Sequence, residues 1–438
     1  MNIQIIQQLY SYFIQNPIVC TDTRDIKQGA LFFALKGDKF NANKFAEQAL
    51  NAGCSIAVID EVEYKKDERY FLVDDVLTAL QQLANYHRKQ LAIPIISITG
   101  SNGKTTSKEL LNAVLSQKYN VLATKGNLNN HIGVPLTLLS ITKQHEMAIV
   151  EMGANHQGEI AMLCTIAEPD YGMITNIGKA HLEGFGGVEG VIKAKSELYH
   201  YINKKGGKLF VNGDNELLKR LSIGMDTIVF GTSESFDFIG LFVESNPFVK
   251  LKYKAKNDSR ILADKATVAT QLIGNYNFEN ILAAACIGNY FNVSEVAINK
   301  GLEGYVPSNN RSQVMKTASN TLLLDAYNAN PSSMSAAIEN FVAMNQANKM
   351  VILGDMLELG EDSAFEHDAV VKLLDKNGIK NAMLVGPYFM KSAKLIGAIS
   401  FMNSDEALQY LLLHPVKDST VLIKGSRGIK LEKVVEAL

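Results

Sequence analysis

The sequence lacks several features that would narrow its function at once. It has only four cysteines, Cys20, Cys54, Cys164 and Cys286, scattered without a CxxC pair. Their spacing argues against a zinc site or a disulfide framework and favours buried free thiols in a reducing compartment. The formal net charge is −2 and there is no long basic run, so bulk electrostatics gives no reason to expect a nucleic acid partner.

Long apolar runs are also missing. No stretch approaches the roughly 20 apolar residues that span a bilayer, so we expect no integral membrane segment. Residues 1–17 lack the basic start and uninterrupted apolar core of a signal peptide, and their Ile and Leu residues at helical spacing predict an amphipathic helix. We expect a cytoplasmic protein, and a monomer.

What is present is ordinary globular composition, with 47% hydrophobic and 20% charged residues among 438. Apolar β-rich runs alternate with helical patterns, which predicts an α/β fold with largely parallel sheets. We predict three domains, at residues 1–92, 93–306 and 307–438. Within the second, residues 236–273 change to the alternation typical of antiparallel strands, and the third has the pattern of a smaller doubly wound, Rossmann-like domain.

The most informative stretch is "IISITGSNGKTTSKELL", residues 95–111. A strand that runs into a glycine turn and then a helix exposes successive backbone N–H groups that cradle an anion. Gly100 and Gly103 let the backbone close tightly. Lys104 can reach the β and γ phosphates, and the Thr105 hydroxyl is placed to bind Mg²⁺. A chance match is on the order of one in a hundred for a chain of this length.

This loop departs from the common GxxxxGK[ST] pattern, because only two residues separate its glycines. The variant and the motifs after it resemble the Mur ligase family, ATP-dependent amide ligases of bacterial cell-wall precursor synthesis. The resemblance covers essentially the whole chain. The motifs, in the family's order, are "TGSNGKTT", "KGNLNNHIGVP", "VEMGANHQGEI", "NIGKAHLEGFGG", "AKSE", "GNYNFEN", "NNRSQV", "LLLDAYNANPSSM" and "LIKGSRG".

The resemblance implies a UDP-binding N-terminal α/β domain, a central P-loop ATPase domain and the Rossmann-like C-terminal domain. The final motif, "LIKGSRG", resembles the family member that joins D-Ala-D-Ala to UDP-MurNAc-tripeptide. Such ligases phosphorylate a carboxylate with ATP, and an amine then attacks the acyl phosphate. A site of this kind must neutralise much negative charge, so cations and Mg²⁺ dominate its design.

Four residues are the candidate catalytic groups: Lys104, Glu151, His181 and Lys195. Glu151 ends a predicted strand, where open α/β sheets place their ligand crevice, and the resemblance makes it a Mg²⁺ ligand beside Thr105. His181 and Lys195 are expected at a second Mg²⁺ site. On sequence alone Lys195 is a solvated helical lysine; the resemblance implies that CO₂ carbamylates it, which requires a neutral, desolvated amine.

The remaining candidates bind nucleotide and substrate. The ATP site is expected to comprise Gly100, Ser101, Asn102, Gly103, Lys104, Thr105, Thr106, Asn280, Arg311 and Asp325. Substrate contacts are expected from Thr23, Arg24, Lys36 and Gly37 toward the UDP group, from Asn130 toward ligand oxygens, and from Asn328, Asn330, Ser332, Lys424, Ser426 and Arg427 toward the dipeptide. Turn chemistry explains the asparagines equally well, and an interdomain salt bridge is the competing interpretation of Arg311.

Two alternatives stay open at this point. A different Mur-family ligase would add another amino acid, although "KGSRG" speaks against it. A non-catalytic ATP-binding regulatory protein would have no use for Glu151, His181 and Lys195, and all three are present. The third residue of the tripeptide, diaminopimelate or lysine, has no determinant that we can identify.

Overall fold

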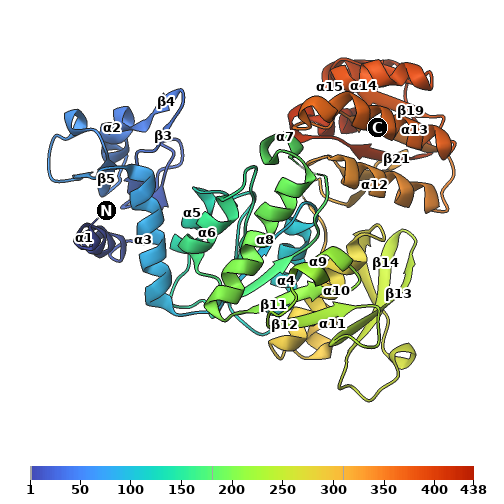
Figure 1. Ribbon diagram of the computed structural model, residues 1–438. Helices are drawn as coiled ribbons and strands as arrows, with labels where there is room; N and C mark the ends of the chain where they lie inside the picture. The colour runs from blue at the N-terminus through green and yellow to red at the C-terminus, as the bar shows by residue number, and fades with distance from the viewer. Residues whose placement is uncertain (1, 180, 309) are drawn as a thin grey trace.

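The computed structural model describes residues 2–179, 181–308 and 310–438. It consists of three α/β lobes, each built around its own sheet (Figure 1). The predicted fold class is therefore confirmed, whereas the residue limits of the three domains stay predictions. Ala180 and Asn309, which fall within two of the quoted motifs, lie outside the described residues. All four cysteines are free and buried, as expected.

The N-terminal lobe has a parallel sheet with the strand order β1-β2-β5-β6. Its first helix is the amphipathic helix that the sequence predicts, and the Asn2 side chain caps it. The elements of this lobe are α1 (Ile3–Phe13), β1 (Val19–Cys20), β2 (Leu31–Phe33), β3 (Lys36–Gly37), β4 (Phe40–Asn41), η1 (Ala42–Phe45), α2 (Ala46–Asn51), β5 (Ile56–Ile59), η2 (Val62–Tyr64), β6 (Tyr70–Leu72) and α3 (Val76–Leu91).

The central lobe has the strand order β15-β14-β13-β12-β11-β10-β7-β9-β8. Neighbours from β8 to β13 are parallel, and β13, β14 and β15 are antiparallel, as the alternation in residues 236–273 predicts. Its elements are β7 (Ile95–Thr99), α4 (Lys104–Leu115), β8 (Val121–Ala123), α5 (Gly133–Leu139), β9 (Met147–Glu151), α6 (Glu159–Ala167), β10 (Tyr171–Ile174), α7 (Leu182–Phe185), α8 (Val188–Lys205), β11 (Lys208–Asn212), α9 (Glu216–Leu221), β12 (Thr227–Gly231), β13 (Phe238–Ser245), β14 (Phe248–Ala255), η3 (Leu262–Asp264), β15 (Val268–Ile273), α10 (Asn277–Tyr290) and α11 (Glu295–Gly304).

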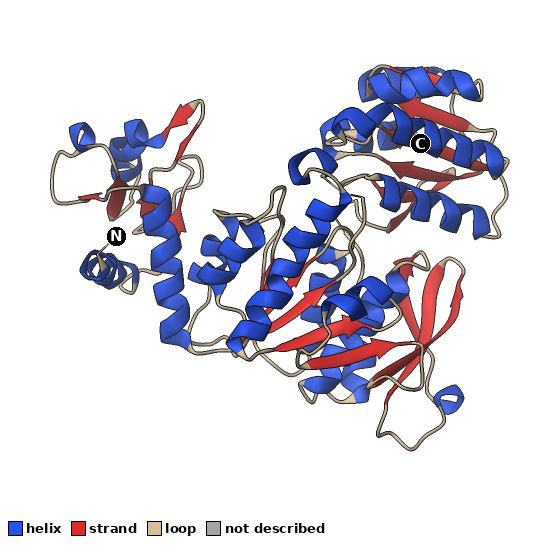
Figure 2. Ribbon diagram, viewed as in Figure 1, coloured by secondary structure: helices blue, strands red, loops and turns tan. Residues whose placement is uncertain are grey.

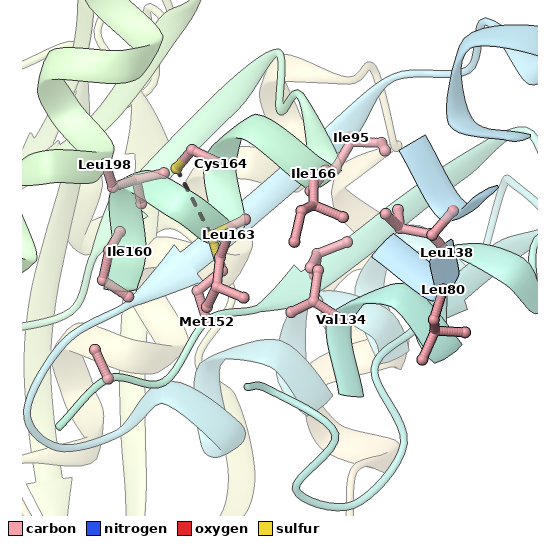
Figure 3. Packing of buried hydrophobic residues seen from close by; sticks show 14 of the residues in the cluster. Leu80, Ile95, Val134, Leu138, Met152, Ile160, Leu163, Cys164, Ile166 and Leu198 are labelled. Atoms are coloured by element: carbon pink, nitrogen blue, oxygen red, sulfur yellow. Dashed lines mark hydrogen bonds between the residues drawn. The ribbon is translucent and has the colours of Figure 1, made fainter. Parts of the chain in front are cut away.

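Helices cover both faces of the central sheet (Figure 2). Side chains of α5, α6 and α8 fill one face, and α3 packs there too, so the N-terminal lobe shares this core. Figure 3 shows that packing, with Leu80 of α3 close to Leu138 of α5, and the Cys164 thiol 3.8 Å from the Met152 sulfur. Helices α4, α10 and α11 pack on the other face. Burial of both faces explains why the strands read as continuous apolar runs.

The phosphate-loop strand lies where the order of the central sheet reverses. From β7 the chain moves to β8 and β9 on one side and then to β10 on the other. Loops that leave the carboxyl ends of such strands diverge, and open α/β sheets place their ligand crevice there. The fold thus positions the turn after β7 between the ends of β9 and β10.

The C-terminal lobe has the order β16-β17-β21-β18-β19-β20, parallel except for β16. Strands β16 and β20 were not predicted from sequence, because both are short and only partly buried. The elements are β16 (Gln313–Lys316), β17 (Asn320–Asp325), α12 (Pro331–Ala343), β18 (Lys349–Gly354), η4 (Gly360–Asp362), α13 (Ser363–Lys376), β19 (Ala382–Val385), α14 (Pro387–Ser392), η5 (Ala393–Leu395), β20 (Ile399–Phe401), α15 (Ser404–Leu413), β21 (Ser419–Lys424), η6 (Arg427–Ile429) and η7 (Leu431–Ala437).

Candidate active site

The loop between β7 and α4 needs its two glycines for steric reasons. Gly100 has φ +144°, and a Cβ there would lie 2.0 Å from the Thr175 hydroxyl oxygen. Gly103 has φ +78°, and its Cβ would lie 2.8 Å from the side-chain oxygen of Asn280. Both values of φ are rare for side chains with a Cβ. The loop can therefore close against β10 and α10 only with glycine at these positions.

Lys104 folds back over its own loop. Its Nζ donates to the carbonyl oxygens of Gly100, at 2.7 Å, and Ser101, at 3.2 Å. Burial is the main reason that the pKa of Lys104 is lowered, and the charge of Arg311 adds to this while Glu151 opposes it. The ammonium thus lies at the anion cradle, where an oxyanion would replace the two carbonyls as its partner.

Glu151 lies beside the loop and is fixed from several sides. Its carboxylate accepts from the Thr105 hydroxyl at 2.9 Å and from the Asn129 amide at 2.8 Å. Its backbone N–H donates to the Thr124 hydroxyl oxygen at 3.0 Å. Glu151 is only 1% exposed, so the carboxylate has little freedom to move.

The donor set suits a hard cation that is shared with a phosphate ligand. Within residues 2–179, 181–308 and 310–438, no group of three or more His, Cys, Asp or Glu side chains converges as a metal cage. Thr105 and Glu151 instead offer one hydroxyl and one carboxylate next to the cradle. Mg²⁺ is typically held in this way, by one or two protein oxygens together with phosphates and water.

His181 and Lys195 have different surroundings. His181 lines the same cavity, and its Nδ1 contacts a carboxylate oxygen of Glu358 of the C-terminal lobe; the hydrogen bond from His181 lowers the pKa of the Glu358 carboxyl. Lys195 is 2% exposed, with Nζ 3.4 Å from the Ala154 carbonyl oxygen and 5.1 Å from the Phe185 ring centroid. The interpretation of Lys195 as a solvated helical lysine is therefore wrong.

Burial changes the protonation of that amine. Desolvation, reinforced by the charge of Lys104, lowers the pKa of Lys195 to about 7. A substantial neutral fraction thus exists near neutral pH, which is the form that reacts with CO₂. The precondition for carbamylation is present, and carbamylation itself stays a prediction.

The opposite wall comes from the C-terminal lobe. Asp325 and Lys424 are register partners at the ends of β17 and β21, and the Lys424 ammonium lies 2.5 Å from the Asp325 carboxylate. The Arg311 guanidinium stacks on Tyr327 at 3.5 Å from the ring centroid. A salt bridge of Arg311 was the competing interpretation; the contact observed is this cation–π pair.

Polar contacts join the two walls. The Asn330 amide donates to the Asn102 side-chain oxygen at 2.8 Å, across 228 positions of sequence. The Lys179 backbone N–H donates to the Ser332 hydroxyl at 3.2 Å, and its Nζ lies 2.6 Å from a Glu366 carboxylate oxygen. The loop after β10 is therefore the surface on which the C-terminal lobe rests.

Together the walls enclose a cavity of about 630 Å³. Most of the predicted catalytic, nucleotide-binding and substrate-binding residues outside the N-terminal lobe line it. These are Ser101, Asn102, Gly103, Lys104, Thr105, Thr106, Asn130, Glu151, His181, Asn280, Arg311, Asp325, Asn328, Asn330, Ser332 and Lys424.

Other predicted residues lie behind the cavity wall or have structural partners. Ser426 accepts from the Leu357 N–H at 3.0 Å, and Arg427 donates to the Tyr327 hydroxyl at 3.2 Å. Asn130 lines the cavity, but its side-chain oxygen accepts from the N–H groups of Ile132 and Gly133. Turn chemistry, the alternative raised from sequence, thus accounts for that oxygen.

The four residues predicted to face UDP lie on the N-terminal lobe, on the far side of the central lobe from the C-terminal lobe (Figure 1). Arg24 is exposed and pairs with Asp22 at 2.5 Å. Lys36 lies 3.1 Å from Asp60, and Gly37 is next to it on β3. Thr23 lies between Asp22 and Arg24 in the same loop. These groups can act only on a distant part of a long substrate.

Several contributors were missed from sequence. The Asn129 amide donates to the Glu151 carboxylate, and the ring of Tyr327 stacks on the Arg311 guanidinium. The Asn176 side-chain oxygen accepts from the Asn102 N–H at 3.0 Å. Asn129 stands among other asparagines in "NLNNH", so residue type alone does not distinguish it. Tyr327 is an aromatic residue shortly after the aspartate that ends a predicted strand, and this position was a usable signal.

Comparison with known proteins agrees with this architecture. Family models match residues 17–88 (Mur ligase family, catalytic domain), 98–288 (Mur ligase middle domain) and 310–427 (Mur ligase, glutamate ligase domain). The UDP-N-acetylmuramoyl-tripeptide--D-alanyl-D-alanine ligase of Bacillus subtilis is 36% identical, covering 96% of this chain and 92% of the relative.

Solved structures give the same result. A crystal structure of MurF from Acinetobacter baumannii superposes with a TM-score of 0.85 at 32% identity, covering 95% of this chain and 92% of that one. MurF ligase from Thermotoga maritima in complex with ADP gives a TM-score of 0.82 at 26% identity, with 96% of both chains covered. No helix among the described residues is both long and apolar enough to cross a membrane. By these matches over nearly its whole length, the chain belongs to the Mur ligase family.

Proposed function

We propose that this chain is the ATP-dependent ligase that joins D-Ala-D-Ala to UDP-MurNAc-tripeptide in peptidoglycan precursor synthesis. The observation that carries this proposal is a single cavity. It combines a phosphate cradle, a carboxylate–hydroxyl pair suited to Mg²⁺ and, from another lobe, a guanidinium and an ammonium. Relatives named UDP-N-acetylmuramoyl-tripeptide--D-alanyl-D-alanine ligase match the chain over nearly its whole length.

In this proposal ATP lies between the two walls. The N–H groups from Gly103 to Thr106 hold the phosphates, since those of Ser101 and Asn102 already donate to Asn176. Lys104 exchanges the carbonyl oxygens of Gly100 and Ser101 for phosphate oxygens. Arg311 approaches the transferred phosphoryl group, which its planar fork suits. Asn280 and Asp325 face the nucleoside. The ADP complex of the Thermotoga maritima relative supports nucleotide use in this fold.

Thr105 and Glu151 would hold one Mg²⁺, and His181 with a carbamylated Lys195 would hold a second. A bound metal ion would neutralise the charge that builds up on the phosphates during transfer. The chain's own contribution is to fix the donors: Asn129 and Thr124 hold Glu151 in one orientation. Lys195 supplies a desolvated amine that can take up CO₂ and change from a cation into an oxygen donor.

The reaction itself needs a good leaving group on a carboxyl carbon. The terminal carboxylate of the tripeptide attacks the γ-phosphorus of ATP, ADP leaves, and an acyl phosphate forms. The amino group of D-Ala-D-Ala then attacks the acyl carbon, and phosphate departs as the amide bond forms. Water would intercept the acyl phosphate, so a cavity that is closed on the C-terminal side protects it.

We assign the substrate contacts from the lobe and the cavity wall on which each predicted residue lies. Asn328, Asn330, Ser332 and Lys424 line the cavity and would contact the dipeptide, with the Lys424 ammonium available to its carboxylate. Ser426 and Arg427 do not line the cavity and would support this wall through Leu357 and Tyr327. The N-terminal lobe, through Thr23, Arg24, Lys36 and Gly37, receives the UDP group at the other end of the substrate. Four buried free thiols fit a reducing compartment, so we place the protein in the cytoplasm. We also propose that it acts as a monomer.

The test is a phosphate-release assay. Purified protein is given ATP, Mg²⁺ and UDP-MurNAc-tripeptide, with and without D-Ala-D-Ala. We expect phosphate release that depends on the dipeptide, together with a pentapeptide product of the matching mass. Phosphate release that is the same with and without the dipeptide, or that a single amino acid stimulates equally well, would contradict this assignment.

A further inference from the structure

Lys108 is a buried charge for which the proposed function has no use. Its side chain is 0% exposed, on α4, one turn after Thr105. Residues three apart on a helix lie on the same side, so Lys108 lies directly behind the cavity wall that carries Thr105. Burying an ammonium is costly unless hydrogen bonds compensate it, so its partners are informative.

Those partners lead to the end of strand β8. The Lys108 Nζ donates to the Thr124 carbonyl oxygen at 2.6 Å and lies 2.8 Å from a carboxylate oxygen of Glu109. Thr124, which directly follows β8, is 1% exposed. The charge-assisted bond therefore fixes the backbone of Thr124 against α4.

Thr124 in turn fixes Glu151. The Thr124 hydroxyl oxygen accepts the Glu151 backbone N–H at 3.0 Å, and the Glu151 carboxylate accepts from Thr105 at 2.9 Å. The contacts close a ring: Thr105 to Lys108 along one turn of α4, then Thr124, Glu151 and Thr105 again. Three elements, α4, β8 and β9, are tied together at one point.

We propose that Lys108 is a positioning residue that holds the Thr105–Glu151 pair in the geometry that binds Mg²⁺ with the nucleotide phosphates. This inference rests on the proposed function only in taking these two residues as the Mg²⁺ ligands. Contacts made directly to ligating side chains are worth about 10- to 100-fold in metal affinity. Lys108 acts on Glu151 one contact further out, through the backbone of Thr124, so its loss is expected to cost about 10-fold.

The experiment measures metal-dependent nucleotide binding, so it does not require turnover. Lys108→Met keeps an unbranched apolar stem and removes the ammonium. ADP affinity is measured by calorimetry in EDTA and again in saturating Mg²⁺. We expect unchanged affinity in EDTA, because the loop N–H groups remain, and a loss of about 10-fold in the Mg²⁺-dependent gain, the lower end of the range for contacts outside the ligands.

Lys265→Met is the matched control. Lys265 is also a buried ammonium, paired with Asp258 at 3.0 Å and Glu295 at 2.5 Å, and neither of these two acids lines the cavity. Its removal should lower the Tm and leave the Mg²⁺-dependent gain as in the wild type. Equal losses in both variants would overturn the proposal, since they would reflect general destabilisation.

Thr124→Val serves if Lys108→Met does not fold, since it removes only the hydroxyl that accepts from Glu151. It should reduce the Mg²⁺-dependent gain in the same direction. Three outcomes would each overturn the inference. The folded variants could keep the full Mg²⁺-dependent gain in ADP affinity, they could lose ADP affinity equally with and without Mg²⁺, or the wild type could bind ADP with the same affinity in EDTA and in Mg²⁺. A wild type that gains affinity with Mg²⁺ but does not ligate would instead contradict the proposed function and leave this inference standing.

Discussion

The two walls of the cavity are built in different ways. On the central wall Glu151 is 1% exposed and is held by residues of its own lobe. On the C-terminal side, both charged contacts with the central lobe include one partly solvated side chain: that of Lys179 is 47% exposed and that of Glu358 is 58% exposed. The central wall is therefore preorganised for phosphate and metal, whereas the other wall contributes only when the lobes are correctly placed.

The largest expected effect is on the preorganised wall. Lys104→Ala removes the ammonium at the loop, and we expect ligation to fall by on the order of 10³-fold, because charge on the transferred phosphoryl group loses a fixed partner. Steady-state kinetics at saturating ATP gives the measure. Ligation at an undiminished rate would show that the loop does not hold the triphosphate.

A charge on the C-terminal wall should matter next. Arg311→Lys keeps the charge but loses the planar fork and its stacking on Tyr327, so kcat should fall on the order of 10²-fold. ADP affinity should change less than kcat. The control is Arg260→Lys, an exposed arginine paired with Asp258. Equal kinetics for both variants would argue that Arg311 does not reach the phosphates.

Substitution of Lys195 tests whether a carbamate on this side chain serves as a metal ligand in the central wall. Lys195→Ala removes a proposed metal ligand, so the ligation rate should fall by at least the roughly 10- to 100-fold that contacts outside the ligands are worth. Short-chain carboxylates such as acetate should restore part of the rate. The neighbouring Lys193→Ala is the control. Full activity without added carboxylate would refute the role of Lys195.

The same lysine predicts a pH dependence of stability. Burial lowers the pKa of Lys195 to about 7 in the native protein, from 10.5. Between these values the unfolded chain holds a proton that the native protein has lost, so the free energy of unfolding rises with pH. Relative to Lys195→Met, the wild type should gain stability from about pH 7 upward in CO₂-free buffer, by chemical denaturation. A pH-independent difference would contradict the burial of a neutral amine.

The smallest effect is expected at the contact between the lobes. Exchanging the charges of the Lys179–Glu366 pair one at a time should slow ligation a few-fold, since partly exposed pairs contribute about 1 kcal/mol or less. The double exchange, Lys179→Glu with Glu366→Lys, should recover most of the rate. If the double variant is as slow as the single ones, the pair does not place the C-terminal lobe.

The sequence was most informative where chemistry forces a local pattern. The strand–glycine–helix stretch identified the loop, and the end of an apolar run identified Glu151, whereas Asp325 was predicted from the family resemblance. It was least informative about contacts between distant segments, such as Asn330 with Asn102 or Arg311 with Tyr327. Short, half-buried strands such as β16 and β20 also escaped prediction, because too few apolar residues mark them.

Local composition thus specified the parallel α/β lobes, the glycine turn and the residue types available to bind phosphate. Tertiary structure decided which of them meet. Only the packing of α8 against the central sheet buries Lys195 and lowers the pKa of its amine, and only the order of the strands brings the ends of β7 and β9 together. The reason is that burial and proximity depend on all packed elements at once, whereas a sequence pattern records neighbours along one chain.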